Sequence, residues 1–334
     1  GNILTSISVP PANLYFTNVS GVLFSKDLTV LVSYPGSRGG SYVVPGTVTT
    51  ILGSAFEYSP SLGSVSIGTN VTSIGYAAFF DCASLTAITV NATNAFYSST
   101  NGVLFDKNKT LLIQYPIAVG GSYVIPGTVL NLADGAFGDA FSLTSVVIPN
   151  SVTNIGFETF YNCQSLAGVF LGNHIISIGG SAFYYCPNLT SVVIPASVAS
   201  IGAYAFGDCQ SLGSVCFEGK PPIDGGGIFY YDFALVSILY VNSATGWGST
   251  YDGIATAPCT TCGTNLPQLG ILLSGTNVLV GWSTSYSGFT LQSTTNLSPP
   301  VAWATVSPAP SIVGSYYAVT NPIAGTKKFY RLSQ

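Results

Sequence analysis

Charged side chains are scarce in this chain. Asp, Glu, Lys and Arg make up only 6% of its 334 residues, against about 25% in an ordinary soluble protein. The net charge is −4 and no basic cluster is present, which excludes the positive footprint that nucleic-acid binding requires. Ser, Thr, Asn, Gly and Tyr must therefore supply the polar surface, and this composition favours a secreted protein that is extracellular or attached to a cell surface.

Long apolar runs are missing as well. Hydrophobic residues make up 47% of the chain, but no stretch reaches the ~18 residues that a membrane-spanning helix needs, so no membrane span is predicted. The sequence contains no methionine and therefore no initiator residue. It is interpreted as a processed form or a fragment of a longer chain.

Candidates for catalysis are equally few. His174 is the only histidine, and a surface position explains it better than a role as general base. No phosphate-binding loop and no nucleophile motif occurs, and no pair of carboxylates stands apart in the way that a glycosidase would need. We expect no enzyme, no catalytic residue and no cofactor.

What the chain does contain is an internal repeat of 23 residues, and repeats are decisive for fold assignment. "LTSVVIPNSVTNIGFETFYNCQS" begins at Leu143, and "LTSVVIPASVASIGAYAFGDCQS" begins at Leu189. We call each unit a coil and count repeat positions from its first residue. The coils begin at residues 4, 39, 62, 85, 120, 143, 166, 189, 212 and 235.

The residue types at the repeat positions predict a stacked β-structure. Positions 4 and 6 are apolar while positions 3 and 5 point the other way, which is the alternation of a strand. Proline at position 7 ends that strand in several coils. A single coil cannot bury its apolar face, but a stack of coils can. Position 18 is phenylalanine in most coils: Phe56, Phe79, Phe137, Phe160, Phe183, Phe206 and Phe229.

Two coils are longer than the rest. Their extra residues contain "GVLFSKDLTVLVSYP" at about residues 21–35 and "GVLFDKNKTLLIQYP" at about 102–116. In each segment two apolar runs flank a turn of Lys, Asp or Asn, which predicts a β-hairpin.

These features together resemble the BspA-type leucine-rich repeat of bacterial surface proteins. The resemblance covers about residues 1–257 and includes the hairpin insertions. "CFEGKPPI" and "LVSILYVNSATGWGSTYDG", within residues 212–257, resemble the C-terminal cap of that family. The resemblance implies a curved solenoid with a parallel sheet on one side and short turns or helical segments on the other. It also implies surface attachment, adhesion and partner binding rather than one chemistry.

The remainder of the chain differs in composition. Residues 258–267 contain "PCTTCGTNLP" and are interpreted as a linker. Residues 268–334 contain short alternating runs separated by Gly, Pro and Asn, which predicts a small antiparallel β-sandwich. Within them, "GFTLQSTTNLSPPVAW" and "FYRL" resemble a C-terminal module of secreted proteins from Verrucomicrobia-like bacteria. The predicted fold class is therefore mainly β, a solenoid followed by a sandwich.

The cysteines divide into two groups. Side chains at the same repeat position run parallel, whereas a disulfide needs converging Cβ atoms, so the cysteines at position 21 are predicted to be buried thiols. In the linker, Cys259 and Cys262 are predicted to form a local disulfide; half of a zinc site is the alternative, but no second pair exists, and no metal is expected. Cys216, at outward position 5, is expected to be free or paired between chains. The position-21 cysteines are Cys82, Cys163, Cys186 and Cys209.

The outward face of the predicted sheet offers a candidate binding surface. Position 3 is mostly serine, and position 5 is apolar in a strip formed by Val124, Val147, Phe170 and Val193. Such a strip can bind a surface protein or a glycan. The preference of Val and Ser for strands explains the same residues without a partner, and a regular ladder also permits an ice-binding interpretation.

The N-terminal end of the solenoid suggests self-association. No cap precedes the first coil, so Leu4, Ile7 and Val9 would be open to water. One interpretation is that the cap was removed with preceding sequence. Otherwise another copy covers this coil, and a head-to-tail contact that does not close propagates into a homo-polymer. We therefore expect a secreted structural protein that forms filaments or a surface matrix, with an adhesin as the alternative.

Overall fold

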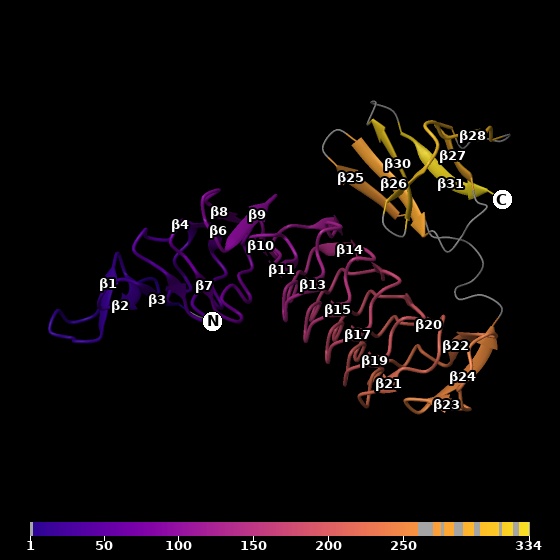
Figure 1. The fold of residues 1–334 in the computed structure, drawn as a ribbon, viewed down its shortest axis with the longest axis horizontal. Helices are drawn as coiled ribbons and strands as arrows, with labels where there is room; N and C mark the ends of the chain where they lie inside the picture. Colours follow the sequence, from indigo (N-terminus) through magenta and orange to yellow (C-terminus); the bar gives the residue numbers. More distant parts are fainter. Residues whose placement is uncertain are drawn as a thin grey trace.

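The computed structural model describes residues 3–259, 270–274, 277–283, 290–296, 301–313, 316–322 and 327–333. Strands are the only regular elements in this part of the chain, so the prediction of a mainly β protein is confirmed. The helical segments that were an alternative for the far side of the coils do not form in the described residues. The coils follow one another along a curved path (Figure 1). No helix within the described ranges is long and apolar enough to cross a membrane.

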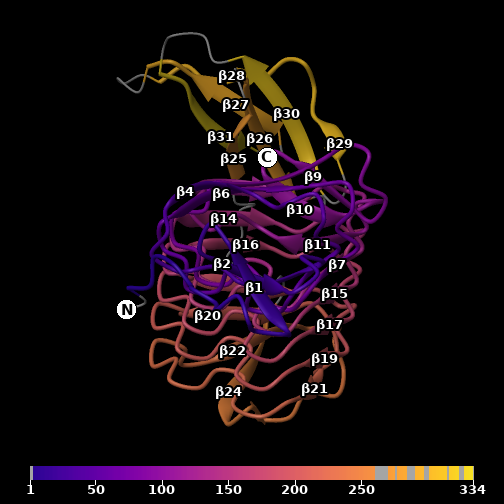
Figure 2. The same ribbon diagram turned by 90° about the vertical axis from the view of Figure 1, so that its left-hand side faces the viewer.

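One side of each regular coil contributes a strand to parallel β-sheet. Residues 23 apart pair in register, as Val146 does with Tyr123 and Val169. Three separate sheets divide this side, and Figure 2 shows their strands along one flank of the stack. Their parallel strands are β4 (Gly40–Val43), β6 (Leu62–Ile67), β8 (Ala87–Val90), β12 (Gly121–Val124), β14 (Leu143–Val147), β16 (Gly168–Phe170), β18 (Ser191–Ile194), β20 (Ser214–Phe217), β22 (Ile238–Val241) and β24 (Ile254–Cys259).

The opposite side carries strands of only two residues at positions 12 and 13. They too pair in parallel with the neighbouring coils, as Ile155 does with Ile178. At the end of the solenoid, β23 (Thr250–Tyr251) turns back to pair antiparallel with β24. The two-residue strands of this side are β5 (Thr50–Ile51), β7 (Ser73–Ile74), β13 (Asn131–Leu132), β15 (Asn154–Ile155), β17 (Ser177–Ile178), β19 (Ser200–Ile201) and β21 (Ile223–Asp224).

The two insertions are antiparallel units of three strands, one strand more than a hairpin. The last strand of each unit also pairs in parallel with the short strand of the following coil, β3 with β5 and β11 with β13. The insertion therefore continues the stack instead of projecting from it. The units consist of β1 (Phe16–Val19), β2 (Val22–Ser25) and β3 (Val30–Ser33), and of β9 (Tyr97–Thr100), β10 (Val103–Asp106) and β11 (Leu111–Gln114).

A ladder of phenylalanine rings runs through the core, as the sequence predicts. Phe160, Phe183 and Phe206 are fully buried, and the ring centres of successive members lie 5.0 and 5.1 Å apart. Where an insertion interrupts the repeat, a tyrosine takes the place of the missing ring: Tyr34 lies 5.2 Å from Phe56, and Tyr115 lies 4.9 Å from Phe137. The insertions thus preserve the apolar contacts of the coils that they separate.

Each regular coil turns twice through the left-handed region of backbone conformation. In the coils that begin at 39, 62, 120, 143, 166, 189 and 212, positions 16 and 20 both have positive φ angles, as at Glu158 and Asn162 with 52° and 56°. Few non-glycine residues adopt this conformation unless their surroundings hold it. Hydrogen bonds between coils hold the left-handed residues in place here. For example, the amide of Phe160 donates to the carbonyl oxygen of Ala182 in the next coil at 2.7 Å. These bends replace the helix of other solenoids.

The C-terminal region contains two small antiparallel sheets (Figure 1). Val280, Trp282, Leu291, Val306 and Val319 bury their side chains together between them. The first sheet has the order β25 (Gly270–Ser274), β26 (Asn277–Ser283), β30 (Tyr316–Pro322), β29 (Ser311–Val313), and the second has the order β28 (Ala304–Thr305), β27 (Thr290–Thr294), β31 (Phe329–Ser333).

Candidate interaction surfaces

The outward face of the parallel strands brings together the strip that the sequence singled out. Val124 pairs with Val147, which pairs with Phe170, so these three side chains lie on adjacent strands. Val193 follows on β18, where it pairs with Cys216. Val124 is exposed, and Val147, Phe170 and Val193 are half-buried. The strip is therefore accessible, and its binding of a partner stays a prediction.

Serine side chains connect the coils along the same face. The hydroxyl of Ser145 donates to that of Ser122 at 2.6 Å, and Ser64 donates to Ser41 at 2.8 Å. Each pair joins position 3 of two successive coils, which gives the face a polar row beside its apolar strip. Strand β25 of the C-terminal region lies close to β12, so that region approaches the strip at its Val124 end.

The first coil differs from the others. Residues 4–9 form no strand, although their sequence matches the strand of the later coils. The coil is held instead by hydrogen bonds to the first insertion, from the Ile7 amide to the Gly21 carbonyl at 2.8 Å and from the Val9 amide to Asn18 Oδ1 at 3.0 Å. Leu4 is 45% exposed, whereas Leu143 at the same repeat position is fully buried. Self-assembly through Leu4, Ile7 and Val9 stays a prediction.

The position-21 cysteines are buried thiols, as predicted. The thiol of Cys186 donates to the carbonyl oxygen of Phe160 at 3.3 Å, and that of Cys163 donates to Phe137 at 3.2 Å. Burial raises the pKa of the Cys186 and Cys209 thiols well above the ordinary value. Their role is to satisfy a carbonyl group of the preceding coil, and no group of three or more His, Cys, Asp or Glu side chains in the described part of the chain is arranged to hold a metal ion.

Of the two cysteines predicted to lie in the linker, Cys259 lies instead at the end of β24, where it pairs with Val241 of β22. Cys262 lies outside the described residues, so its predicted disulfide with Cys259 stays a prediction. The expectation for Cys216 was wrong: this residue is 1% exposed and disulfide-bonded. Its sulfur also lies 3.6 Å from that of Cys259, a distance too long for an S–S bond. Cys216 keeps the register of position 5, because it pairs with Val193 of β18 and Leu239 of β22.

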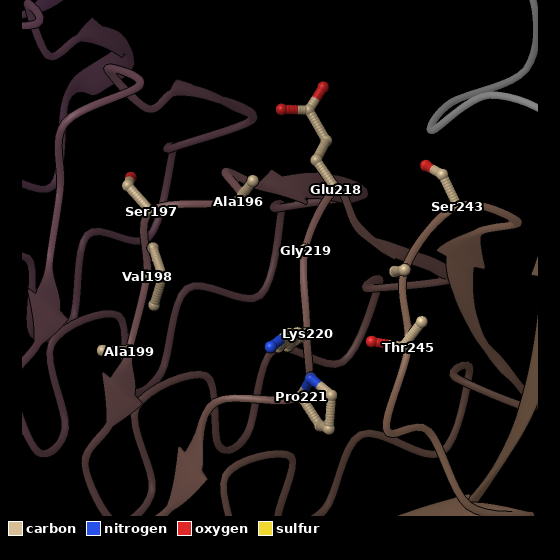
Figure 3. Close-up of a pocket in the computed structure, with 11 residues that line it drawn as sticks. Ala196, Ser197, Val198, Ala199, Glu218, Gly219, Lys220, Pro221, Ser243 and Thr245 are labelled. Atoms are coloured by element: carbon tan, nitrogen blue, oxygen red, sulfur yellow. The ribbon is translucent and has the colours of Figure 1, made fainter.

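A groove that the sequence analysis missed crosses three coils near the C-terminal end of the solenoid (Figure 3). Its volume is about 540 Å³, and it follows the turns after β18, β20 and β22. Glu218 occupies position 7, where Pro195 stands one coil earlier, and Lys220 follows at position 9. Burial raises the pKa of Glu218. The sequence did contain a signal for this groove: Glu218 and Lys220 are charged, whereas the other coils have uncharged residues at positions 7 and 9.

The polar groups of the groove do not converge on one point. In Figure 3 the Glu218 carboxylate lies at one end, away from the Lys220 ammonium group, and the hydroxyls of Ser243 and Thr245 line the opposite wall. The floor is fixed by a hydrogen bond of 3.0 Å from Trp247 Nε1 to the carbonyl oxygen of Gly219. Such a groove offers hydrogen bonds to a polar ligand but no constellation for catalysis.

Comparison with known proteins identifies the repeat. The sequence matches the BspA type leucine rich repeat region in six copies over residues 38–111 and 130–250, which is more than half of the chain. A search of curated proteins finds no significant match.

Solved structures share the fold. A leucine rich cell surface protein from Faecalibacterium prausnitzii is 26% identical with a TM-score of 0.53, and the match covers 68% of this chain and 64% of that one. The chain thus spans a little under two thirds of that relative. The pneumococcal vaccine antigen PcpA is 16% identical with a TM-score of 0.53, over 76% of this chain and 94% of that one.

Proposed function

Because the chain belongs to the BspA-type leucine-rich-repeat family, we propose that it is a non-enzymatic module of the cell surface that binds a protein or a glycan through the outward sheet face. Its extracellular location is supported by the cell-surface relative from Faecalibacterium prausnitzii. The scarcity of charge and the Ser- and Thr-rich surface also suit a secreted chain.

The observation that carries this proposal is the character of the sheet face. Parallel sheets are normally covered on both faces, and the core covers only the inner face here. On the outer face Val147, Phe170 and Val193 form an uncharged, accessible strip, and Ser145, beside Val147, is hydrogen-bonded to Ser122 of the preceding coil. An apolar strip with a polar margin is typical of a surface that binds a partner.

Binding measurements on a panel of purified extracellular proteins and glycans test the proposal. Val147→Asp and Val193→Asp should each weaken binding at least about tenfold, because a charge at the centre of an apolar contact loses its hydration. Thr190→Asp is the matched control, since Thr190 is exposed at position 2 of the coil that carries Val193. The sheet face is not the binding surface if no member of the panel binds. The same conclusion follows if Val147→Asp and Val193→Asp bind as tightly as the control, Thr190→Asp.

A second candidate function is head-to-tail self-association into extracellular filaments or a surface matrix. The exposed apolar residues of the first coil favour it: Ile3 is 90% exposed, and Leu14 and Tyr15 are 78% and 75% exposed. A second copy can cover this end of the stack, most simply through the C-terminal region, for which we propose a small β-sandwich because its two sheets share a common apolar cluster.

Particle size separates the two candidates. The intact chain should form polymers visible by electron microscopy, and either Ile7→Asp or deletion of residues 263–334 should leave single solenoids. A chain that stays monomeric at high concentration contradicts self-association but leaves partner binding by the sheet face intact.

A further inference from the structure

Aromatic rings gather on the side of the solenoid where the coils bend, in every regular coil from 39 to 212 except the one that begins at 120. The paired left-handed bends at positions 16 and 20 bury position 18, while side chains at positions 15, 16, 19 and 20 face outward or lie at the surface in most of the coils that begin between 39 and 212. Aromatic and acidic residues fill more than half of these positions. We call the exposed rings the aromatic ridge; its most exposed members include Tyr76, Phe157, Tyr204, Tyr230 and Tyr231.

The rings of the ridge contact one another from coil to coil. Tyr161 stacks on Tyr184 with 5.8 Å between ring centres, and Tyr204 meets Tyr230 edge to face at 5.6 Å. Tyr230 in turn lies 4.1 Å from Tyr231. Large aromatic side chains of this kind are normally buried in the core. A group of them that is exposed to water and in mutual contact therefore indicates an interaction surface, which single scattered rings would not.

Carboxylates lie between the rings, and no cation does. Glu57, Asp81, Asp134, Glu158 and Asp208 occupy the same outward repeat positions, and none of the Lys and Arg residues does. Burial and then the charges of Glu158, Asp134 and Glu57 raise the pKa of Tyr76. Acids from three coils therefore act on one exposed ring, and the ridge is negatively charged around Tyr76.

We propose that the aromatic ridge is a docking surface for a cationic polypeptide segment rich in Lys and Arg. The faces of aromatic rings attract ammonium and guanidinium groups, and the neighbouring carboxylates offer charge-assisted hydrogen bonds to the same groups. Charge complementarity of this kind selects a cationic partner over a neutral one. The ridge lies on different repeat positions from the strip of the sheet face, so this docking is independent of the proposed function.

The spacing of the ridge suits an extended segment. An extended chain presents side chains on one face every ~6.8 Å, close to the distances of 5.8 and 5.6 Å between rings of adjacent coils. Across two neighbouring coils, a segment that runs along the solenoid can thus place successive side chains of one face near the rings of both coils. A partner with several cations gains from each coil that it crosses.

Fluorescence anisotropy on the full chain tests this docking with a labelled peptide of alternating arginine and serine. Its counterpart with glutamine in place of arginine should not bind. Tyr76→Leu combined with Tyr230→Leu should weaken binding about tenfold, because leucine keeps apolar area but has no π face. The variant with Tyr76→Phe and Tyr230→Phe should bind as tightly as the wild type. Because both positions are exposed, neither double variant should change the thermal unfolding of the protein.

The carboxylates are tested against a control that removes a carboxylate outside the ridge. Glu57→Gln combined with Glu158→Gln should weaken binding about fivefold at low ionic strength, whereas Glu218→Gln, in the groove near the opposite edge of the coils, should leave it unchanged. Added salt should weaken binding by the wild type. The proposal is overturned if the peptide does not bind, if Glu218→Gln weakens binding as much as a ridge variant, or if neutral glycans bind the ridge more tightly than the arginine peptide does.

Discussion

The thiol of Cys186 donates a hydrogen bond to the carbonyl oxygen of Phe160, 3.3 Å away in the preceding coil. The same contact joins Cys163 to Phe137 and Cys209 to Phe183. Position 21 of one coil therefore completes the backbone hydrogen bonding of position 18 in the coil before it. The cysteine column and the phenylalanine ladder are two parts of one contact between coils.

Phe183→Ala should lower the free energy of unfolding by about 3–5 kcal/mol, because truncating a buried ring loses apolar contacts and leaves a cavity. Phe183 lies between Phe160 and Phe206 in the stacked ladder. Urea denaturation measures the change. Tyr185→Ala, at an exposed position of the same coil, should change stability far less, and equal effects of the two variants would mean that the ladder does not hold the stack together.

The position-21 cysteines should resist alkylation in the folded protein. Burial raises the pKa of Cys82 to about 12, so the reactive thiolate is almost absent at pH 8. Mass spectrometry after iodoacetamide treatment should find Cys82, Cys163, Cys186 and Cys209 unmodified without denaturant and modified with it. Rapid labelling of any of the four in the native protein would show that its coil opens or that its side chain is accessible.

Gly202→Ala should destabilise the solenoid by about 1–3 kcal/mol or more, since overpacking of a tight contact forces the backbone apart. A Cβ atom at Gly202 would overlap the backbone nitrogen of Gly180 in the previous coil. Gly127→Ala is the matched control, because a Cβ atom there meets nothing within 4 Å. The comparison of the two melting curves decides whether close approach of the coils requires glycine.

Asp232 should make the end of the solenoid sensitive to pH. Burial raises its pKa to about 8, although the Cys209 amide donates to its carboxylate and opposes the shift. The folded state therefore holds the proton more tightly than the unfolded state does. The resulting stabilisation is complete below about pH 4 and is lost as the pH rises through about 8.

Asp232→Asn should accordingly be more stable than the wild type at pH 8.5, by roughly 1–3 kcal/mol after allowance for screening by solvent. The two proteins should differ little at pH 4. Asp224→Asn, which changes an exposed acid of the same coil, serves as the control for net charge. An equal gain in both variants at pH 8.5 would contradict a specific role of Asp232.

The candidate surfaces could be predicted only in part. The strip of Val124, Val147 and Phe170 follows from strand alternation, because outward and inward residues alternate wherever the coil pairs with its neighbours. The same rule predicted a strand in the first coil, and there it did not hold; it did hold for the register of Cys216, although this side chain is buried. The first coil pairs with the insertion instead, and β24 closes the sheet beside β22.

The sequence by itself determined the coil: its length of 23 residues, its inward strand positions and its column of phenylalanines at position 18. These positions face the interior of every coil, so each copy needs the same residue type and the period is visible. Only the tertiary structure decided what the bends on the far side of the coils present to solvent. Positions 15, 16, 19 and 20 differ between coils, and their side chains become neighbours only when the left-handed bends turn them outward and the coils stack. A surface formed across coils leaves no period in the sequence, because no single coil has to contain all of it.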